Sequence, residues 1–284
     1  MPSEPKILSY RAADGHELHY RRWRPDGEPC GDVVALHGIQ SHGGWYGWSS
    51  ARLCAAGYDV RFLDRRGSGL NAPPRGHADS AAQLLGDVTR FLALVREEQT
   101  TTRPLVLLGV SWGGKLAAVV AGERPDLVDG LALLYPGLRA RVRPNRWQSV
   151  MISAAARLGL GRRSVRIPLD DPALFTDQPQ WQEFIRQDAL SLHTATVSFL
   201  RTSIELDRLA ETALPRIRCP VLCALAGRDR IIDNTATRRY LERFAARQCS
   251  IIEYPTAAHT LEFDPCREQF VSDVLDWMNG IRVA

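Results

Sequence analysis

The stretch Leu107-Leu108-Gly109-Val110-Ser111-Trp112-Gly113-Gly114 joins a strand pattern to a helix pattern with no loop between them. The apolar run at 105–110 predicts a buried strand, and the residues from Trp112 onward predict a helix over 112–124. Such an abrupt reversal crowds the chain, so small residues are expected two positions before and two positions after Ser111, where glycines stand. The turn lifts the Ser111 hydroxyl out of the sheet and directs a helix N-terminus towards it. Ser111 is therefore the candidate nucleophile.

Short apolar runs alternate with longer helical patterns on both sides of this stretch. The runs are nearly continuous in Val, Leu and Ile, as is typical of parallel strands covered on both faces. The runs lie at 33–36, 60–63, 105–110, 131–135, 221–226 and 251–254, and helices are expected at 46–56, 80–98, 112–124, 235–247 and 265–280. An extended pair at 6–11 and 17–24 precedes them. This order predicts an α/β fold with a mostly parallel, doubly wound sheet.

The alternation stops between residues 137 and 207. No strand-like run occurs there, the helical patterns are looser, and prolines interrupt them at 144, 168, 172 and 179. The segment is too long for a plain loop. We therefore expect a helical cap at 137–207, inserted into a core that is formed by 1–136 and 208–284.

Polar residues follow two later strands at their carboxyl ends, where open α/β sheets carry their sites. Asp229 comes after the run at 221–226, and His259 comes after the run at 251–254. The chain order of Ser111, Asp229 and His259 is that of a Ser-His-Asp triad on such a sheet. Asp233 is the alternative carboxylate, but its place just before an expected helix indicates a helix N-cap.

A His-Gly turn follows the run at 33–36, within the stretch Leu-His-Gly-Ile-Gln-Ser-His-Gly-Gly of residues 36–44. Such a turn can supply a backbone N–H to an oxyanion hole, and the predicted donors are the amides of Ile39 and Trp112. The imidazole of His37 is expected to shape the turn rather than to act as a base. Side chains near the turn and aromatic side chains of the insert are the candidate substrate-binding residues: His37, Gln40, His42, Trp147 and Trp181.

The composition is that of an ordinary globular protein, with 284 residues, 45% hydrophobic and 24% charged. These values exclude a disordered chain, a collagen-like repeat and a small disulfide-stapled scaffold. The N-terminus lacks an apolar signal-peptide region and the six cysteines include no Cys-x-x-Cys pair, so we expect reduced thiols in a cytoplasmic protein. No His, Cys or carboxylate cluster has metal-ligand spacing, so neither a metal nor an organic cofactor is expected.

The net charge of +4 is too small to predict nucleic-acid binding, but its distribution is uneven. Residues 137–166 contain no acidic residue and eight arginines: Arg139, Arg141, Arg143, Arg146, Arg157, Arg162, Arg163 and Arg166. Apolar side chains are interleaved with them. The pattern fits a solvated cap face whose arginine stems cover the cap core. It also fits a surface that makes transient contact with anionic lipid.

The chain resembles the lysophospholipase and monoacylglycerol-lipase branch of the α/β-hydrolase superfamily, close to the serine aminopeptidase (S33) group. The motifs that carry the resemblance lie at 36–46, 64–69, 109–113, 227–229 and 258–260, and the insert is similar to the family's cap at 167–172 and 184–188. The chain differs from many monoacylglycerol lipases at Val110 and Trp112, where those enzymes carry His and Met.

The resemblance implies an α/β-hydrolase fold and a serine hydrolase that cleaves carboxylic esters through an acyl-enzyme, with Ser111, His259 and Asp229 as its triad. Lipid-like esters, monoacylglycerols or lysophospholipids, are the implied small-molecule partners. A thioesterase, an aminopeptidase or an acyltransferase on the same triad stays open, because specificity depends on the cap and the loops. A non-catalytic ligand-binding protein of the same fold is the remaining alternative, and the intact set of three residues argues against it.

Overall fold

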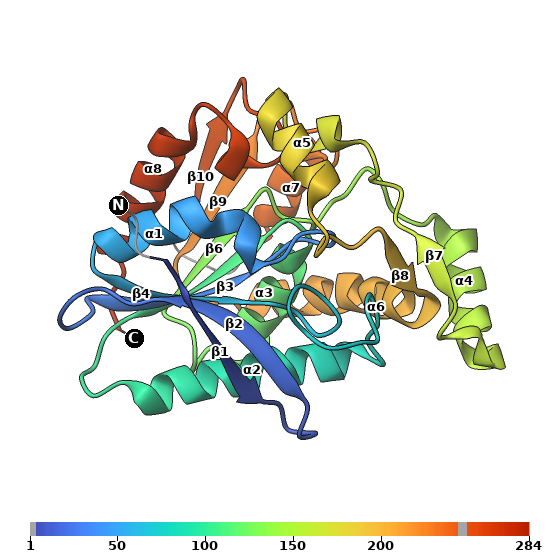
Figure 1. Ribbon diagram of the computed structural model, residues 1–284, viewed down its shortest axis with the longest axis horizontal. Coiled ribbons are helices and arrows are strands. Elements are labelled where there is room, and N and C mark those ends of the chain that lie inside the picture. Colours follow the sequence, from blue (N-terminus) through green and yellow to red (C-terminus); the bar gives the residue numbers. More distant parts are fainter. Residues whose placement is uncertain (1–3, 244–248, 284) are drawn as a thin grey trace.

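The computed structural model describes residues 4–243 and 249–283, and an eight-stranded sheet runs through these residues (Figure 1). The strand order is β1-β2-β4-β3-β5-β6-β9-β10; β1 with β2 and β2 with β4 are antiparallel, and the other neighbours are parallel. The strands are β1 Lys6–Arg11, β2 Glu17–Trp23, β3 Gly31–Leu36, β4 Tyr58–Leu63, β5 Leu105–Val110, β6 Gly130–Leu134, β9 Val221–Ala226 and β10 Cys249–Tyr254. The predicted α/β class and its mostly parallel sheet are confirmed.

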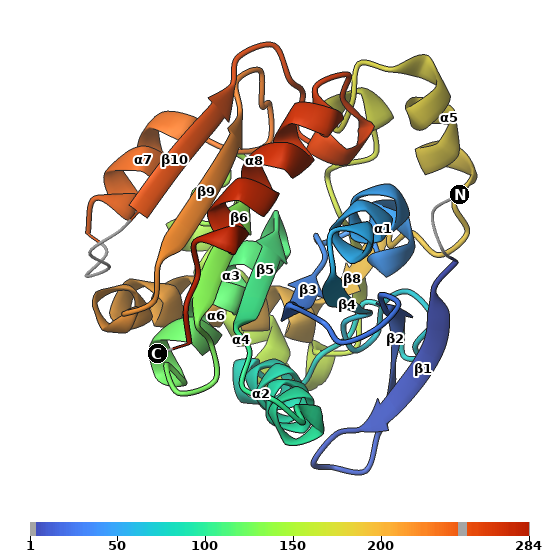
Figure 2. The same cartoon turned by 90° about the vertical axis from the view of Figure 1, so that its left-hand side faces the viewer.

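Helices cover both faces of this sheet. The helices are α1 Gly47–Ala55, α2 Ala81–Glu98, α3 Trp112–Glu123, α4 Arg146–Ala155, α5 Pro179–Gln187, α6 Val197–Ala213, α7 Asn234–Leu241 and α8 Arg267–Asn279. Helices α1 and α8 contact each other on one face, whereas α2 and α3 lie on the other face with α6 packed outside α3 (Figure 2). The doubly wound arrangement therefore follows from the alternation of apolar runs and helical patterns.

The central strands are buried along their whole length, which explains their continuous apolar sequences. Strand β4 begins two residues before the predicted run and adds Tyr58 and the charged residue Asp59 to it, while the charged residue Arg61 lies within the run itself. The Arg61 guanidinium is 1% exposed and pairs with Asp32 at 2.5 Å and with Asp59 at 3.2 Å. These ion pairs allow two charged side chains to lie inside the sheet, which an apolar pattern cannot predict.

The segment between β6 and β9 carries α4, β7 Ser164–Arg166 and β8 Thr194–Thr196 to the right-hand end of the molecule in Figure 1, while α5 lies at the top. The two short strands stand where none was predicted. They form an antiparallel pair of three residues each. Their sequences are Ser-Val-Arg and Thr-Ala-Thr, which are too short and too polar to stand out as strand patterns.

The predicted boundary of the insert at residue 207 falls inside α6, which begins at Val197 and ends at Ala213. The helix packs against α3 along the sheet. The division into a core and a cap therefore stays a prediction, and α6 is the element that links the two.

The C-terminal third follows the predicted order. Helix α7 ends at Leu241, and residues 244–247 of the predicted helix at 235–247 lie outside the described residues. Among the described helices, none is both long enough and apolar enough to cross a membrane.

Candidate active site

Ser111 stands at the turn between β5 and α3, and its backbone has a conformation that L-residues rarely adopt. Its φ is +48° and its ψ is −120°. A Cβ atom at Gly109 would lie 2.7 Å from the Cβ of Ala117, and one at Gly113 would lie 2.6 Å from the carbonyl oxygen of His37. Both distances are shorter than real Cβ contacts, so the prediction of small residues at these positions is confirmed. Close packing on both sides holds the strained backbone of Ser111 in place.

Ser111, His259 and Asp229 form a continuous hydrogen-bonded row. The Nε2 atom of His259 lies 3.0 Å from the Oγ of Ser111, and its Nδ1 atom lies 2.7 Å from the Oδ2 of Asp229. The other carboxylate oxygen of Asp229 accepts hydrogen bonds from the backbone amides of Ile231 and Ile232, at 2.7 and 2.8 Å. The His259 and Asp229 side chains are 2% and 0% exposed. The carboxylate is thus fixed by the backbone of its own loop, and it in turn orients the imidazole.

The alternative carboxylate, Asp233, has a different position. Its Oδ1 accepts a hydrogen bond from the amide of Ala236 at 2.9 Å and caps the N-terminus of α7. The prediction of a helix N-cap is confirmed. Among residues 4–243 and 249–283, no group of three or more His, Cys, Asp or Glu side chains is placed to hold a metal ion.

The loop after β3 lies directly against Ser111. A Cβ atom at Gly38 would lie 3.4 Å from the Cβ of Ser111, and the Gly38 amide donates to the Oγ of Ser41 at 3.0 Å. The Nδ1 of His37 lies 2.7 Å from the carbonyl oxygen of Gly38, while its Nε2 accepts from the amide of Arg65 at 2.9 Å. Burial, together with the charge of Arg65, holds the pKa of His37 well below its usual range. His37 is therefore a neutral side chain with both nitrogens engaged by the backbone, and it shapes the loop.

Residues 27–266 match the family of serine aminopeptidases S33, also called Hydrolase_4. The chain belongs to this family. It is an α/β-hydrolase of the esterase- and lipase-like serine hydrolase type, as the resemblance implied.

Relatives of this S33 hydrolase align over nearly its full length. A monoacylglycerol lipase of Mycolicibacterium smegmatis is 25% identical over 95% of each chain. The phospholipase YtpA of Bacillus subtilis is 26% identical, covering 87% of this chain and 93% of its own. The crystal structure of the Paleococcus ferrophilus monoacylglycerol lipase is 24% identical, with a TM-score of 0.82 over 92% of this chain and 98% of its own. At that identity, the last comparison establishes the fold alone.

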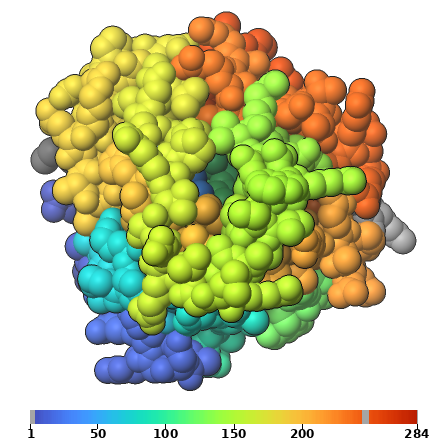
Figure 3. Space-filling view, turned by 90° about the vertical axis from the view of Figure 1, so that its right-hand side faces the viewer, coloured from blue at the N-terminus to red at the C-terminus, as the bar shows by residue number. Residues whose placement is uncertain are grey.

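Ser111 of this S33 hydrolase lines a cavity of about 650 Å³. Figure 3 looks onto the end of the molecule where this cavity lies and shows a hollow between green and yellow-green segments of the insert. Ile39 and Trp112, the predicted amide donors, line the same cavity. Most of the wall is apolar and comes from the insert, from α6 and from the loop after β9, through Leu138, Met151, Ile152, Leu200, Ile204 and Ile231.

One of the five predicted substrate-binding side chains, Trp147, lines this cavity, and the structure places the other four outside it. His37 is engaged by the backbone, as described above. The Nε2 of His42 lies 3.0 Å from the Oδ2 of Asp188, and the Trp181 ring stacks on Phe263 at 4.7 Å. Gln40 is buried, and it lines a separate cavity of about 520 Å³. Contacts outside the Ser111 cavity thus hold His37, His42 and Trp181.

The sequence did not predict an ion pair in the wall of this cavity. Lys115 of α3 pairs with Asp207 of α6, and both line the wall near Ser111. Leu200, Ile204 and Asp207 are spaced so that they share one face of α6. This spacing is the only feature of the sequence that could have indicated their common place in the cavity wall. The sequence alone could not show that this face meets α3.

The loop after β3 is also tied to the insert, through Asp188. Its carboxylate accepts from the indole of Trp45 at 2.6 Å and from Ser191 at 2.7 Å, and it contacts His42. Burial would raise the pKa of Asp188, but hydrogen bonds from His42, Trp45 and Ser191 outweigh it and hold the pKa well below its usual value. The amide of Leu192 adds a hydrogen bond to the backbone oxygen of Gln40. Residues 188–192 thus clamp the loop that lies against Ser111.

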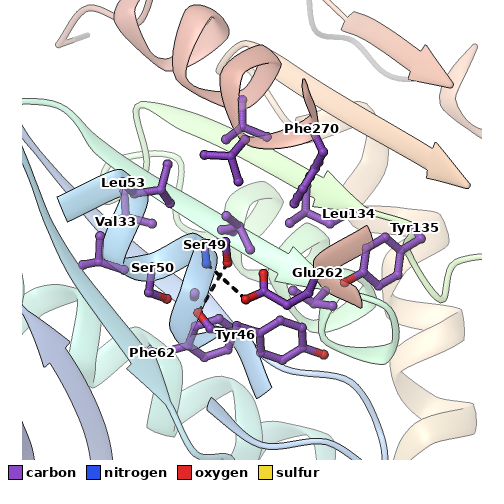
Figure 4. A pocket seen from close by; sticks show the side chains of 16 residues that line it. Val33, Tyr46, Ser49, Ser50, Leu53, Phe62, Leu134, Tyr135, Glu262 and Phe270 are labelled. Carbon is purple, nitrogen blue, oxygen red and sulfur yellow. Dashed lines mark hydrogen bonds between the residues drawn. The ribbon is translucent and has the colours of Figure 1, made fainter. Parts of the chain in front are cut away.

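A buried carboxyl group lies three residues after His259. The Oε1 of Glu262 accepts from the amides of Trp48 and Ser49, at 3.1 and 3.0 Å, at the start of α1. Its other oxygen has no protein partner among the described residues and faces a cavity of about 20 Å³ beside Tyr46 and Tyr135 (Figure 4). That volume suits one water molecule. Glu262 therefore anchors the loop that carries His259 to α1.

Burial raises the pKa of Glu262 to about 7, so this group makes folding pH-dependent. Its folded pKa lies above its unfolded pKa, so its contribution to stability is full below about pH 4.5 and is lost as the pH rises through 7. Glu262→Gln mimics the neutral form of the carboxyl group. We therefore expect the free energy of unfolding of this variant to depend less on pH in this range. Between pH 5 and 8 the wild type should lose on the order of 2–3 kcal/mol relative to the variant. Denaturant unfolding at several pH values measures this difference.

A matched control is Glu268→Gln, which removes an exposed carboxylate from α8. Its profile should run parallel to that of the wild type. Parallel profiles for wild type and Glu262→Gln would show that Glu262 is ionised throughout this pH range.

Proposed function

We propose that the protein hydrolyses carboxylic esters of lipid-like molecules, monoacylglycerols or lysophospholipids, with Ser111 as nucleophile, His259 as base and Asp229 as its orienting partner. The observation that carries the proposal is the row of hydrogen bonds from Ser111 through His259 to Asp229. Ser111, at one end of this row, lines a largely apolar cavity. Nucleophile and base lie within hydrogen-bond reach, and a third group orients the base, as nucleophilic catalysis requires.

In this reaction, His259 accepts the Ser111 proton at Nε2 while Oγ attacks the ester carbonyl. Asp229 holds the proton on Nδ1 and stabilises the imidazolium. The tetrahedral oxyanion accepts hydrogen bonds from the amides of Ile39 and Trp112. Trp112 is the first residue of α3, so its amide lacks an intrahelical acceptor and can serve this role. The alkoxide leaves with the proton from His259, and water then hydrolyses the acyl-enzyme.

We assign residues 137–207 to a cap that holds the acyl chain. Support comes from the apolar side chains that this segment contributes to the Ser111 cavity, among them Leu138, Val142 and Ile152. Each methylene group that enters such a wall gains about 0.8 kcal/mol. The acyl chain would therefore supply much of the binding energy.

We expect kcat/KM for p-nitrophenyl esters to rise from acetate towards medium chains, by at most about fourfold for each methylene. The rise should level off or reverse once the cavity of about 650 Å³ is filled. Initial rates across a series of even-numbered chains measure this. A flat profile, or a preference for acetate, would contradict the lipid-like substrate class.

The same assays separate the other activities that a triad supports. Aminoacyl naphthylamides, acyl thioesters and a competing alcohol acceptor test the aminopeptidase, the thioesterase and the acyltransferase. Faster turnover of one of these than of the matched ester would move the assignment to that class. Absence of all turnover, with no labelling by a fluorophosphonate, would favour a ligand-binding protein.

We further propose that the insert touches lipid surfaces. Val150 and Leu158 are 64% and 78% exposed, and Arg146 and Arg157 lie near them in the sequence. Such a mixture is typical of surfaces that lie in the membrane interface. The protein should sediment with vesicles that contain anionic lipid, and Val150→Ser with Leu158→Ser should reduce the bound fraction at least threefold. Ile7→Ser, an exposed aliphatic on β1, is the control, and equal losses in both variants would contradict a specific surface.

A further inference from the structure

A second, more open groove adjoins the cavity that contains Ser111. Its volume is about 1260 Å³, and it lies between the segment 139–157 and helix α6. The two spaces share a wall that includes Arg139, Arg141 and Arg143. An ester bound at Ser111 can therefore extend from the apolar cavity into this groove.

Arginines dominate the groove, and its acidic residues are already paired. Asp207 pairs with Lys115, while Glu211 pairs with Arg139 and with Arg243. The groove therefore has no free carboxylate among the described residues to neutralise a further cation.

The other arginines of the groove pair with no carboxylate of the described chain: Arg141, Arg143, Arg146, Arg157 and Arg208. The Nε of Arg141 donates to the carbonyl of Ile232 at 3.2 Å, which orients its guanidinium at the shared wall and leaves its terminal nitrogens available. Five cations around one groove repel one another, and a bound anion would relieve that repulsion. Residues 137–166 contain no Asp or Glu side chain that could relieve this repulsion from within the same segment.

We propose that this groove binds a phosphate group on the alcohol or thiol portion of the substrate, while the acyl chain occupies the apolar cavity. The inference rests on the proposed function and specifies its substrates as esters whose leaving group carries phosphate; a phosphate-bearing thiol as the leaving group would place the activity in the thioesterase class. Arg141 and Arg143, which line both spaces, are the specificity-determining residues.

Phosphate fits the groove better than the alternatives. A guanidinium presents a planar fork of donors that matches phosphate oxygens, and several forks can bind one dianion. A neutral glycerol headgroup would leave the arginines without a counterion. The acyl chain belongs in the cavity beside Ser111, because apolar side chains make up most of that wall.

The reaction balances without a further reactant. Ser111 Oγ forms the acyl bond, the bond from the carbonyl carbon to the leaving oxygen or sulfur breaks, and His259 transfers the serine proton to the leaving atom. Water then releases the fatty acid. The phosphate stays on the leaving group throughout, so the groove acts by binding.

The test compares substrates with one acyl chain: 1-decanoylglycerol, 1-decanoylglycerol 3-phosphate and decanoyl-coenzyme A. All are used below their critical micelle concentrations, so that binding to lipid aggregates does not contribute. We expect kcat/KM for a phosphate-bearing substrate to exceed that for 1-decanoylglycerol at least tenfold. A preference for the glycerol phosphate indicates a phospholipid source, and a preference for the thioester indicates a coenzyme source.

The variant Arg141→Gln with Arg143→Gln should reduce the ratio of phosphate to neutral kcat/KM by about 10- to 100-fold, since each charged hydrogen bond lost costs roughly a factor of ten or more. The matched control is Arg162→Gln with Arg163→Gln, which removes the same charge from the same segment but lines neither space. Its ratio should stay within twofold of the wild type. The rate of fluorophosphonate labelling at Ser111 verifies that each variant is folded.

Equal or better turnover of the neutral ester by the wild type would overturn the phosphate assignment and leave the ester hydrolase intact. A fall in the ratio that is equal in both double variants would show a general effect of net charge, and would also overturn it. Failure of the wild type to cleave any of the three substrates or to react with a fluorophosphonate would instead contradict the proposed function itself.

Discussion

Replacing Ser111 by alanine should reduce esterase kcat/KM by on the order of 10³-fold or more and should abolish labelling by a fluorophosphonate. The expected effect is large because Ser111 is the residue whose Oγ meets the imidazole of His259, at 3.0 Å, on a backbone strained so as to present it. Without Oγ no acyl-enzyme can form, and only binding and oxyanion stabilisation remain. Steady-state kinetics and mass spectrometry of the labelled peptide measure both losses.

Ser203 is a suitable control, since it lines the same cavity and its Oγ accepts from the indole of Trp112 at 2.9 Å. Ser203→Ala should still be labelled, and the label should map to Ser111. Wild-type activity in Ser111→Ala, or a label on another serine, would show that the protein is not a serine hydrolase that uses Ser111.

Replacing Asp229 by asparagine should leave the fold intact yet lower turnover by about 10³- to 10⁴-fold. An asparagine oxygen can still accept from the amides of Ile231 and Ile232. Its NH₂ group would then face the Nδ1 of His259, where the carboxylate oxygen stands at 2.7 Å in the wild type. The imidazole must accept there, so its proton moves to Nε2 and the base can no longer take the Ser111 proton.

Asp233→Asn tests whether the loss belongs to this position. Asparagine caps helices as well as aspartate does, so the change should leave turnover within about twofold and stability nearly unchanged. If Asp233→Asn caused the larger loss of turnover and Asp229→Asn had little effect, the orienting carboxylate would be Asp233. Far-UV circular dichroism of both variants shows that the comparison concerns folded proteins.

The main features of the sheet were predictable from local patterns. The central strands of a parallel sheet are covered on both faces, so they read as unbroken apolar runs, and the turn at Ser111 leaves room only for glycine at 109 and 113. The positions of Asp229 and His259 followed from the same logic, because the carboxyl ends of parallel strands meet at one edge. The oxyanion donors and the cap stay predictions that await experiment.

Side-chain direction in the insert was not predictable. Trp147 lines the cavity that contains Ser111. Trp181 is the same residue type in the same segment, but its ring stacks on Phe263 instead. His42 and Gln40 belong to the loop after β3, which lies against Ser111, yet residues 188–192 clamp this loop and the two side chains lie outside the cavity. These outcomes depend on contacts between residues more than eighty positions apart.

The sequence by itself determined the α/β class, the strand-to-helix turn that exposes Ser111 and the strand ends that carry Asp229 and His259. Each depends on the local period of apolar residues or on the steric demands of one turn, which nearby residues dictate. The tertiary structure alone decided which side chains line the cavity, that Lys115 meets Asp207, and that five arginines with no carboxylate partner among the described residues line the adjoining groove. Those features arise where separate elements pack together, and their pairing depends on distances that no local pattern encodes.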